Sequence, residues 1–254
     1  MPPDMPLASA DSVRFYENLW LREWADMERF NPTARHLKRN IVRLIEGVMP
    51  IESILDAGCG MGLNVRDLRE HFPSVRVTGS DLSEPILDVA RKYVGADPAV
   101  DFAPLDLSRG ALGRQFDLVL CNQVLEHLED DVSAIRHLAQ MARRYVLITV
   151  PGGAYNSTSK LVGHFRHYSR DDICSKVSAA GLRIVSQREW GFPVHSLYKL
   201  MLGLLPQKAQ KSVGMGKYGV AKKLISGAIY LAFYANQFDR GANVIVLAEK
   251  APAP

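Results

Sequence analysis

Cysteine is scarce in this chain of 254 residues, with only Cys59, Cys121 and Cys174. The three are far apart and form no Cys-x-x-Cys pair, which argues against a disulfide framework and against a zinc-binding module. We therefore predict no metal site and a reducing, cytoplasmic environment.

Long apolar runs are also missing. No window holds about 18 consecutive apolar residues, the length needed to cross a bilayer. The first residues, MPPDMPLASADS, lack the basic stretch and apolar core of a secretory signal. Both absences predict a cytoplasmic protein without a spanning helix.

Acidic residues are absent from one long segment, between Glu189 and Asp239, which contains six lysines. The whole chain has a net charge of only +4, so the positive excess belongs to this segment. A charge this mild does not argue for nucleic acid. Hydrophobic residues make up 47% of the chain and charged residues 23%, as in ordinary globular domains.

Short apolar runs alternate with stretches of helical periodicity, the pattern of a parallel sheet covered by helices. The fold class we predict is α/β, with a Rossmann-like, mostly parallel sheet of seven strands and helices on both faces. The strands are expected at Ser53–Ala57, Arg76–Ser80, Val100–Pro104, Phe116–Cys121, Tyr145–Val150, Arg183–Glu189 and Val244–Glu249.

Helical segments precede and interrupt this sheet. An aromatic-rich helix is expected over Phe15–Trp24, and a second is capped by Asn31 with Pro32 at its first position. We also expect a helix that begins with a Ser169/Asp172 capping box and ends at Gly181. Further helices are expected over Val132–Ala142, His195–Leu205 and Val220–Phe238. We thus divide the chain into an N-terminal helical cap (1–50), a core (51–190 with 243–250) and a helical insertion (191–242).

The segment Ile54–Gly62 contains the strongest motif. After an apolar strand that ends near Asp56, the chain turns through Gly58, Gly60 and Gly62 into a helix. Dinucleotide sites use G-x-G-x-x-G, but Leu63 occupies the third glycine position here. A carboxylate beside the turn repels pyrophosphate and attracts an ammonium group, which favours a zwitterionic amino-acid ligand. The alternative is a left-handed turn without a ligand.

Polar residues follow the next strands as well. Asp81, Asp106 and Asn122 come at or just after the ends of the second, third and fourth predicted strands. A carboxylate at Asp81 is placed to accept both hydroxyls of a ribose, and Asp106 to accept an adenine amino group. Each acid is equally well explained alone as a helix cap or a solvated loop charge.

The motifs LDAGCGMG, GSDLS, LDL and FDLVLCNQVLEHL resemble those of class I S-adenosylmethionine-dependent methyltransferases, over Ile51–Pro151 and more loosely to Glu249. This resemblance implies an antiparallel last strand and S-adenosyl-L-methionine as cofactor. It implies that Asp56 and the glycines surround the methionine part, Asp81 holds the ribose, Asp106 and Leu107 flank adenine, and Asn122 lies near the sulfonium. The cofactor-binding set it implies is Asp56, Gly58, Cys59, Gly60, Gly62, Asn64, Asp81, Leu82, Asp106, Leu107 and Asn122.

A hydroxyl acceptor needs a base, for which three histidines are candidates. His127 follows the fourth strand, and a structural hydrogen bond that closes the loop is the alternative we favour for it. His164 and His167 lie in GHFRHYS, a segment that in this family faces the acceptor, although part of it is explained by capping and packing. Arg166 is placed to bind an anionic acceptor or to pair with a nearby acid.

The acceptor is expected to be a small molecule. No Asn-Pro-Pro-Tyr-like tetrapeptide or RNA-binding module appears, so we predict no nucleic acid. In the insertion, Leu197, Leu200, Met201, Leu204 and Leu205 form an apolar helix face with Lys199 outside it. Three roles stay open for segment 195–238: a lid over a hydrophobic, negatively charged acceptor, a helical pair that forms a homodimer, and peripheral contact with an anionic membrane.

Three functions compete. The first is methyl transfer to a small molecule, more on oxygen than on nitrogen or carbon. The second is a non-catalytic protein that binds S-adenosylmethionine for regulation or assembly. The third, a nicotinamide-dependent oxidoreductase, conflicts with the glycine spacing.

Overall fold

The computed structural model describes residues 25–155, 159–160, 162–204, 217–236 and 238–250. The helix predicted over Phe15–Trp24 and the end of the apolar face at Leu205 lie outside the described residues. Within them, no helix is both long and apolar enough to span a bilayer.

A seven-stranded sheet forms the centre of the protein, in the order β3-β2-β1-β4-β5-β7-β6. Strand β7 pairs antiparallel with both β5 and β6, and the other paired neighbours run parallel, as predicted. The strands are β1 (Ser53–Ala57), β2 (Arg76–Asp81), β3 (Val100–Pro104), β4 (Phe116–Asn122), β5 (Ala142–Pro151), β6 (Leu182–Phe192) and β7 (Phe238–Lys250).

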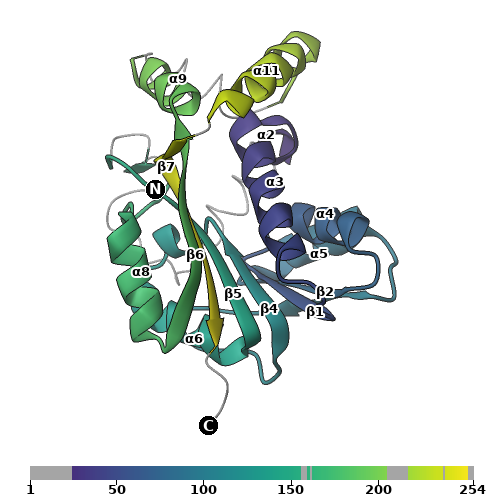
Figure 1. Cartoon of the computed structure of the whole chain (residues 1–254). Coiled ribbons are helices and arrows are strands. Elements are labelled where there is room, and N and C mark those ends of the chain that lie inside the picture. The colour runs from purple at the N-terminus through teal and green to yellow at the C-terminus, as the bar shows by residue number, and fades with distance from the viewer. Residues whose placement is uncertain (1–24, 156–158, 161, 205–216, 237, 251–254) are drawn as a thin grey trace.

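Helices cover both faces of this sheet (Figure 1). Helices α6 (Asp131–Met141) and α8 (Arg170–Ala179) bury residues such as Ile135 and Ile173 against one face. The other face is covered by α3 (Pro32–Glu46), α4 (Leu63–His71) and α5 (Glu84–Val94). Central strands are buried on both faces, which explains their continuous apolar sequences.

Local signals fixed several helix starts. The Asn31 side chain accepts hydrogen bonds from the backbone N–H groups of Thr33 and Ala34, at 2.8 and 3.4 Å. The Ser169 hydroxyl accepts from the N–H of Asp172 at 3.1 Å. Both predicted caps are therefore confirmed. We did not predict helix α5, although Ser83 caps it and Pro85 lies in its first turn.

The late helices lie beyond one end of the sheet. Helices α9 (Val194–Gly203) and α11 (Val220–Ala232), with the short helix η3 (Phe233–Ala235), extend past the ends of β6 and β7 (Figure 1). Of these, α11 lies beside α2 (Ala25–Phe30) and α3, and α9 contacts β6, β7 and η3. Strand β6 continues to Phe192 and β7 begins at Phe238, so the sheet is longer here than predicted. The domain boundaries stay a prediction.

The leucine face of helix α9, for which we left three roles open, points to solvent. Leu197, Leu200 and Leu204 are 57%, 62% and 79% exposed. His195, on the opposite side, is buried and stacks on Trp190 with ring centroids 5.0 Å apart. Helix α9 therefore packs on the protein through its polar side.

Candidate functional site

The glycine turn connects β1 to α4 at the carboxyl edge of the sheet. Gly58, Gly60 and Gly62 all have positive φ angles, of 82°, 52° and 79°. The N–H groups of Gly58 and Cys59 both donate to the carbonyl of Ser80 at 2.8 Å, which ties the turn to the end of β2. Residues with side chains strain at such angles, so glycine is needed here.

Packing adds a second requirement for glycine at position 58. A Cβ atom there would lie 2.4 Å from Cγ2 of Val124, which follows β4. The turn and the loop after β4 are thus in direct contact, although the two lie far apart in sequence. This contact positions the two halves of the candidate site relative to each other.

Two predicted carboxylates flank the turn. Asp56 is fully buried at the end of β1. At the end of β2, Asp81 accepts hydrogen bonds from the N–H of Gly60 at 3.0 Å and from that of Ser83 at 3.1 Å. Burial raises the pKa of Asp81, and these backbone N–H groups oppose that rise. Each of its oxygens has a further lone pair, so the carboxylate keeps acceptor capacity.

Leu82, beside Asp81, is 44% exposed and offers an apolar surface there. In the turn that follows β3, Asp106 accepts from the N–H of Ser108 at 3.0 Å and pairs with Arg109 at 3.1 Å. Leu107 is buried in the core. Asp106 therefore has the local turn role that we considered for it, and adenine recognition there remains a prediction.

The other predicted cofactor residues lie around the same edge. Asn64 is in the first turn of α4, and Cys59 is buried within the turn, where burial and nearby carboxylates raise its thiol pKa. Asn122 ends β4 and its side-chain oxygen accepts from the Thr149 hydroxyl at 2.5 Å. Next to it, Gln123 has a φ of 57°, an uncommon conformation that marks the bend after β4.

The three candidate histidines come together at the ends of β4 and β5. His127 lies in η2 (Leu125–His127), and a bridge between Gly152 and Tyr168 brings GHFRHYS to the end of β5. The rings of His127 and His164 are 4.8 Å apart, and Nδ1 of His164 lies 3.2 Å from Nε2 of His167. Thus the fold joins residues about 40 positions apart into one cluster.

Burial keeps these histidines neutral. Desolvation lowers the pKa of His127 to about 4 and that of His164 to about 2, and it lowers the pKa of His167 as well. Nδ1 of His127 lies 3.3 Å from the carbonyl oxygen of Gly163. The loop-closing hydrogen bond that we favoured for His127 is therefore present.

Arg166 pairs with an acid. Its guanidinium lies 3.1 Å from the Asp131 carboxylate, which also accepts from Tyr168 at 2.8 Å and pairs with Lys176 at 2.7 Å. Of the two roles we gave Arg166, the structure supports the ion pair. This buried network fixes the start of α8 beside the histidines.

Two residues near the cluster were not predicted for the site. Glu126 is 1% exposed, and burial raises its pKa to about 8. Desolvation lowers the pKa of Lys199, and its charge in turn lowers the pKa values of His164 and His167. For Glu126 the sequence did offer a signal, because it directly precedes the candidate His127. Nothing in the sequence indicates that Lys199 faces inward.

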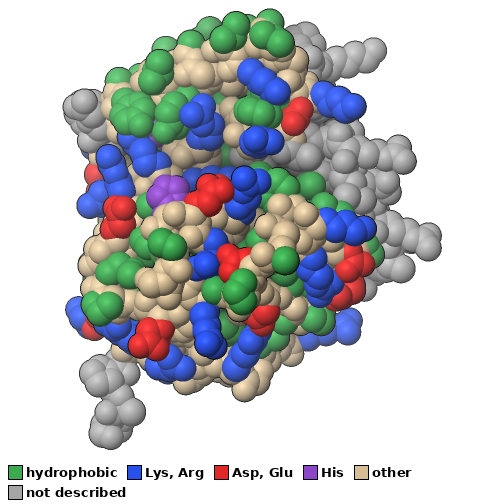
Figure 2. Space-filling model, turned by 90° about the vertical axis from the view of Figure 1, so that its right-hand side faces the viewer, with side chains coloured by type: hydrophobic (Ala, Val, Ile, Leu, Met, Phe, Trp, Pro, Cys, Tyr) green, Lys and Arg blue, Asp and Glu red, His purple; other side chains and the backbone are tan. Residues whose placement is uncertain are grey.

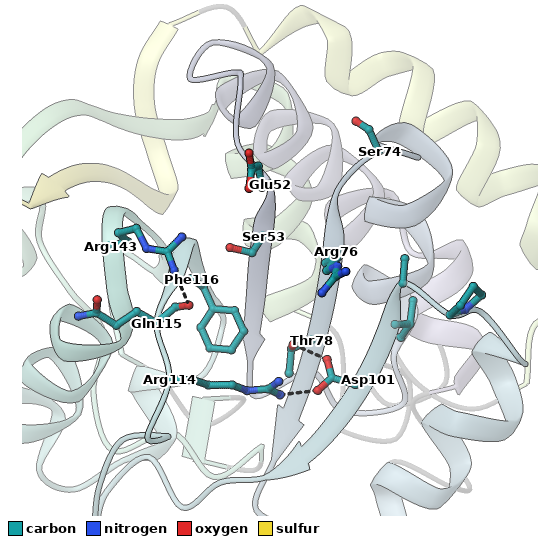
Figure 3. A pocket seen from close by; sticks show the side chains of 13 residues that line it. Glu52, Ser53, Ser74, Arg76, Thr78, Asp101, Arg114, Gln115, Phe116 and Arg143 are labelled. Carbon is teal, nitrogen blue, oxygen red and sulfur yellow. Dashed lines mark hydrogen bonds and ion pairs between the residues drawn. The ribbon is translucent and has the colours of Figure 1, made fainter.

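A hollow of about 830 Å³ lies at the opposite edge of the sheet (Figure 3). It is lined by residues at the starts of strands, such as Ser53, Arg76 and Phe116. Two of its arginines, Arg114 and Arg143, pair with Asp101 and Asp117. In open α/β sheets ligands bind at the carboxyl ends of the strands, so this hollow is not the candidate site.

Comparison with known proteins agrees with this geometry. Residues 55–144 match the family model described as "Methyltransferase domain". The ubiquinone biosynthesis O-methyltransferase of Azoarcus sp. (strain BH72) is 30% identical over 58% of this chain and 61% of its own length. The chain spans between about a third and three fifths of the length of the curated relatives it matches.

Solved structures share the fold at low sequence identity. Magnesium protoporphyrin IX methyltransferase from Synechocystis PCC 6803, with bound SAH, aligns with a TM-score of 0.55 and 19% identity, over 85% of this chain and 83% of that one. The [4+2]-cyclase SpnF aligns with a TM-score of 0.57 and 18% identity, over 87% and 82%. The domain match, the strand order and the glycine turn together show that residues 55–144 belong to a methyltransferase domain and that the chain has the class I S-adenosylmethionine-dependent methyltransferase fold.

Proposed function

We propose that this protein transfers a methyl group from S-adenosyl-L-methionine to a hydroxyl of a small molecule. The observation that supports this best is the arrangement along the carboxyl edge of the sheet. The glycine turn with Asp56 and Asp81 lies at the ends of β1 and β2, and the histidine cluster lies at the ends of β4 and β5. This arrangement supports a donor site at the glycine turn with an acceptor site at the histidine cluster beside it.

The residues of the turn fit the cofactor. Buried Asp56 offers a negative charge to an ammonium group, and Asp81 keeps lone pairs for ribose hydroxyls beside the exposed Leu82. The remaining predicted contacts are Gly58, Cys59, Gly60, Gly62, Asn64, Asp106, Leu107 and Asn122. When bound, S-adenosylmethionine supplies an activated methyl group, so the protein has to supply orientation and exclude water.

Three histidines are the proposed catalytic residues. As neutral rings, His127, His164 and His167 can accept a hydrogen bond from the acceptor hydroxyl and orient its oxygen. A hydroxyl that takes the methyl group from the sulfonium, with S-adenosylhomocysteine as the leaving group, would have to lose its proton, and the His164–His167 contact offers a path for that proton. The Azoarcus relative, which is named an O-methyltransferase, supports oxygen as the atom methylated.

An anionic or hydrophobic acceptor, such as a lipid-, sugar- or polyketide-like metabolite, suits the same region. The charge of Lys199 lowers the pKa values of His164 and His167, and among the described residues Lys199 has no carboxylate partner. A desolvated ammonium without a counterion is costly, so an acceptor with a carboxylate or phosphate would relieve that cost.

Calorimetry tests the cofactor directly. S-adenosylmethionine and S-adenosylhomocysteine titrated into the purified protein should both bind, while NAD should not. Incubation with methyl-labelled cofactor and a cell extract should then yield a labelled small molecule. Cofactor binding without any labelled product would favour the non-catalytic alternative, and the SpnF structure illustrates that this fold is not limited to one reaction.

We also propose a peripheral contact with an anionic membrane surface. Apolar side chains of α9 and α11, such as Leu200 and Leu224, are 62% and 71% exposed. Lys217 and Lys223 are exposed nearby, and apolar and basic side chains mix over this end of the molecule in Figure 2. Apolar faces edged by lysines complement negatively charged headgroups.

Vesicle sedimentation tests this contact. The protein should pellet with vesicles that contain phosphatidylserine and remain in solution with pure phosphatidylcholine, and Leu200→Ser with Leu224→Ser should release it. A homodimer that the same pair of substitutions dissociates, without any vesicle binding, would show instead that these faces pack on a second copy.

A further inference from the structure

Beside the histidine cluster lies a buried acid that methyl transfer does not require. Glu126, His127 and His164 each place one potential ligand atom so that all three atoms lie within 4.8 Å of one another. Two of these residues come from the short helix η2 after β4, and the third comes from the GHFRHYS segment at the end of β5. This grouping exists only in the folded chain.

The Glu126 side chain has an unusual environment. It is 1% exposed, and neither of its carboxyl oxygens has a hydrogen-bond partner among the described residues. Leaving a buried polar group unpaired typically costs about 1–3 kcal/mol, and more if the group is charged. A group this well enclosed and still without donors points to a cation that belongs beside it.

The two histidines are positioned as metal ligands usually are. Nδ1 of His127 contacts the carbonyl oxygen of Gly163, and Nδ1 of His164 contacts His167. Such contacts through one ring nitrogen fix the orientation of the ring and direct Nε2 at a metal ion. Atoms that share a zinc ion at about 2.0–2.2 Å lie closer to one another than the 4.8 Å found here, so the three ligand atoms would have to move together when an ion binds.

In contrast to the absence of a metal site that the sequence predicted, we propose that Glu126, His127 and His164 bind a divalent transition-metal ion. Two imidazoles and one carboxylate are a ligand set for zinc, manganese or iron, and they leave coordination positions open. The site rests on the residues alone, but its role rests on the proposed function. In that role the ion, in place of the rings of His127 and His164, would hold the acceptor hydroxyl and lower its pKa, so that the proton can leave to solvent.

Metal binding is measured on the full chain after treatment with a chelator. Calorimetry with zinc alone should give one site per chain, and cobalt should give the visible absorption of a protein-bound ion. Glu126→Gln, which keeps the size of the side chain, should weaken zinc binding at least tenfold. The control His71→Ala removes an exposed histidine of α4 and should leave the affinity unchanged.

Two results would overturn the site: no stoichiometric zinc on the wild-type chain, or equal affinity of Glu126→Gln and wild type. Equal affinity of the two proteins would mean that any bound zinc is held by another group, such as the partly exposed Cys174. Circular dichroism of Glu126→Gln checks that the variant folds.

The metal site and the methyltransferase proposal can fail separately. S-adenosylhomocysteine should bind Glu126→Gln as it binds the wild type, because Asp81 and the turn are unchanged. Zinc binding without cofactor binding would sink the proposed function and keep the metal site. Cofactor binding without zinc binding would keep the proposed function and overturn the metal site.

Discussion

The two halves of the carboxyl edge are built in different ways. At the ends of β1 and β2 the site is mostly backbone: glycines with positive φ, N–H groups bonded to Ser80 and Asp81, and acids that end their strands. At the ends of β4 and β5 it is a group of buried ionisable side chains from η2, the GHFRHYS segment and α9. The first half depends on local sequence, and the second depends on packing between distant segments.

This contrast indicates which half of the site determines specificity for the methyl acceptor. A backbone turn offers the same donors and acceptors whatever the acceptor is, so it suits a cofactor that a whole family shares. Buried side chains can be exchanged one at a time, and each exchange alters charge and shape near the reacting atoms. We expect substitutions in the first half to change cofactor binding and those in the second to change acceptor binding.

The largest effect should come from the contact that joins the halves. Gly58→Ala places a Cβ atom against Val124 at a φ of 82°, and the clash and strain together should cost about 3 kcal/mol of unfolding free energy. Val124→Ala in the same chain should restore part of that loss, since it removes the clash but not the strain. Denaturant unfolding of both variants measures this, and additive effects would show that the two positions do not couple.

Next in size is the cofactor half alone. Asp81→Ala should weaken S-adenosylhomocysteine binding by about 1–3 kcal/mol, because charge-assisted hydrogen bonds to the ribose are lost. Asp88→Ala, in the exposed face of α5, should leave the dissociation constant as it is. Calorimetry compares the two, and an unchanged affinity for Asp81→Ala would refute the ribose assignment.

The packing of α9 predicts a dependence on pH. Burial lowers the pKa of His195 to about 3, so the folded protein keeps this ring neutral while the unfolded chain binds a proton below about pH 6.5. Its contribution to stability is therefore present above pH 6.5 and falls as the pH drops toward 3, by about 1.4 kcal/mol for each unit. His195→Gln should flatten the stability profile between pH 6.5 and 5, measured by denaturant unfolding; a profile as steep as wild type would contradict the assignment.

The smallest effect tests the acceptor half. Lys199→Gln should raise the Michaelis constant for the acceptor about fivefold, which corresponds to about 1 kcal/mol, and should not change the affinity for the cofactor. It should also tighten zinc binding, because the charge of Lys199 acts on His164. Lys223→Gln, an exposed lysine over the Phe30 ring, is the matched control. Equal effects of both substitutions would reduce the role of Lys199 to general surface charge.

Much of the fold could be predicted from the sequence. The strands from Ser53–Ala57 to Val244–Glu249 were predicted within a few residues at most ends, because buried strands have continuous apolar runs. The starts of two helices were predicted because Asn31 and Ser169 cap them with local hydrogen bonds. The ends of β6 and β7 were missed, since Trp190–Phe192 and Phe238–Asn243 pair over a stretch without a clear apolar pattern.

What the sequence determined by itself was the glycine turn, its flanking acids and the order of strands and helices. These depend on backbone conformation and on periodicity, both of which are set within a few residues. Only the tertiary structure decided that Glu126 lies buried beside two histidines, that Arg166 pairs with Asp131, and that α9 turns Lys199 inward and its leucines outward. Burial and charge pairing arise from segments distant in sequence, so no local pattern encodes them.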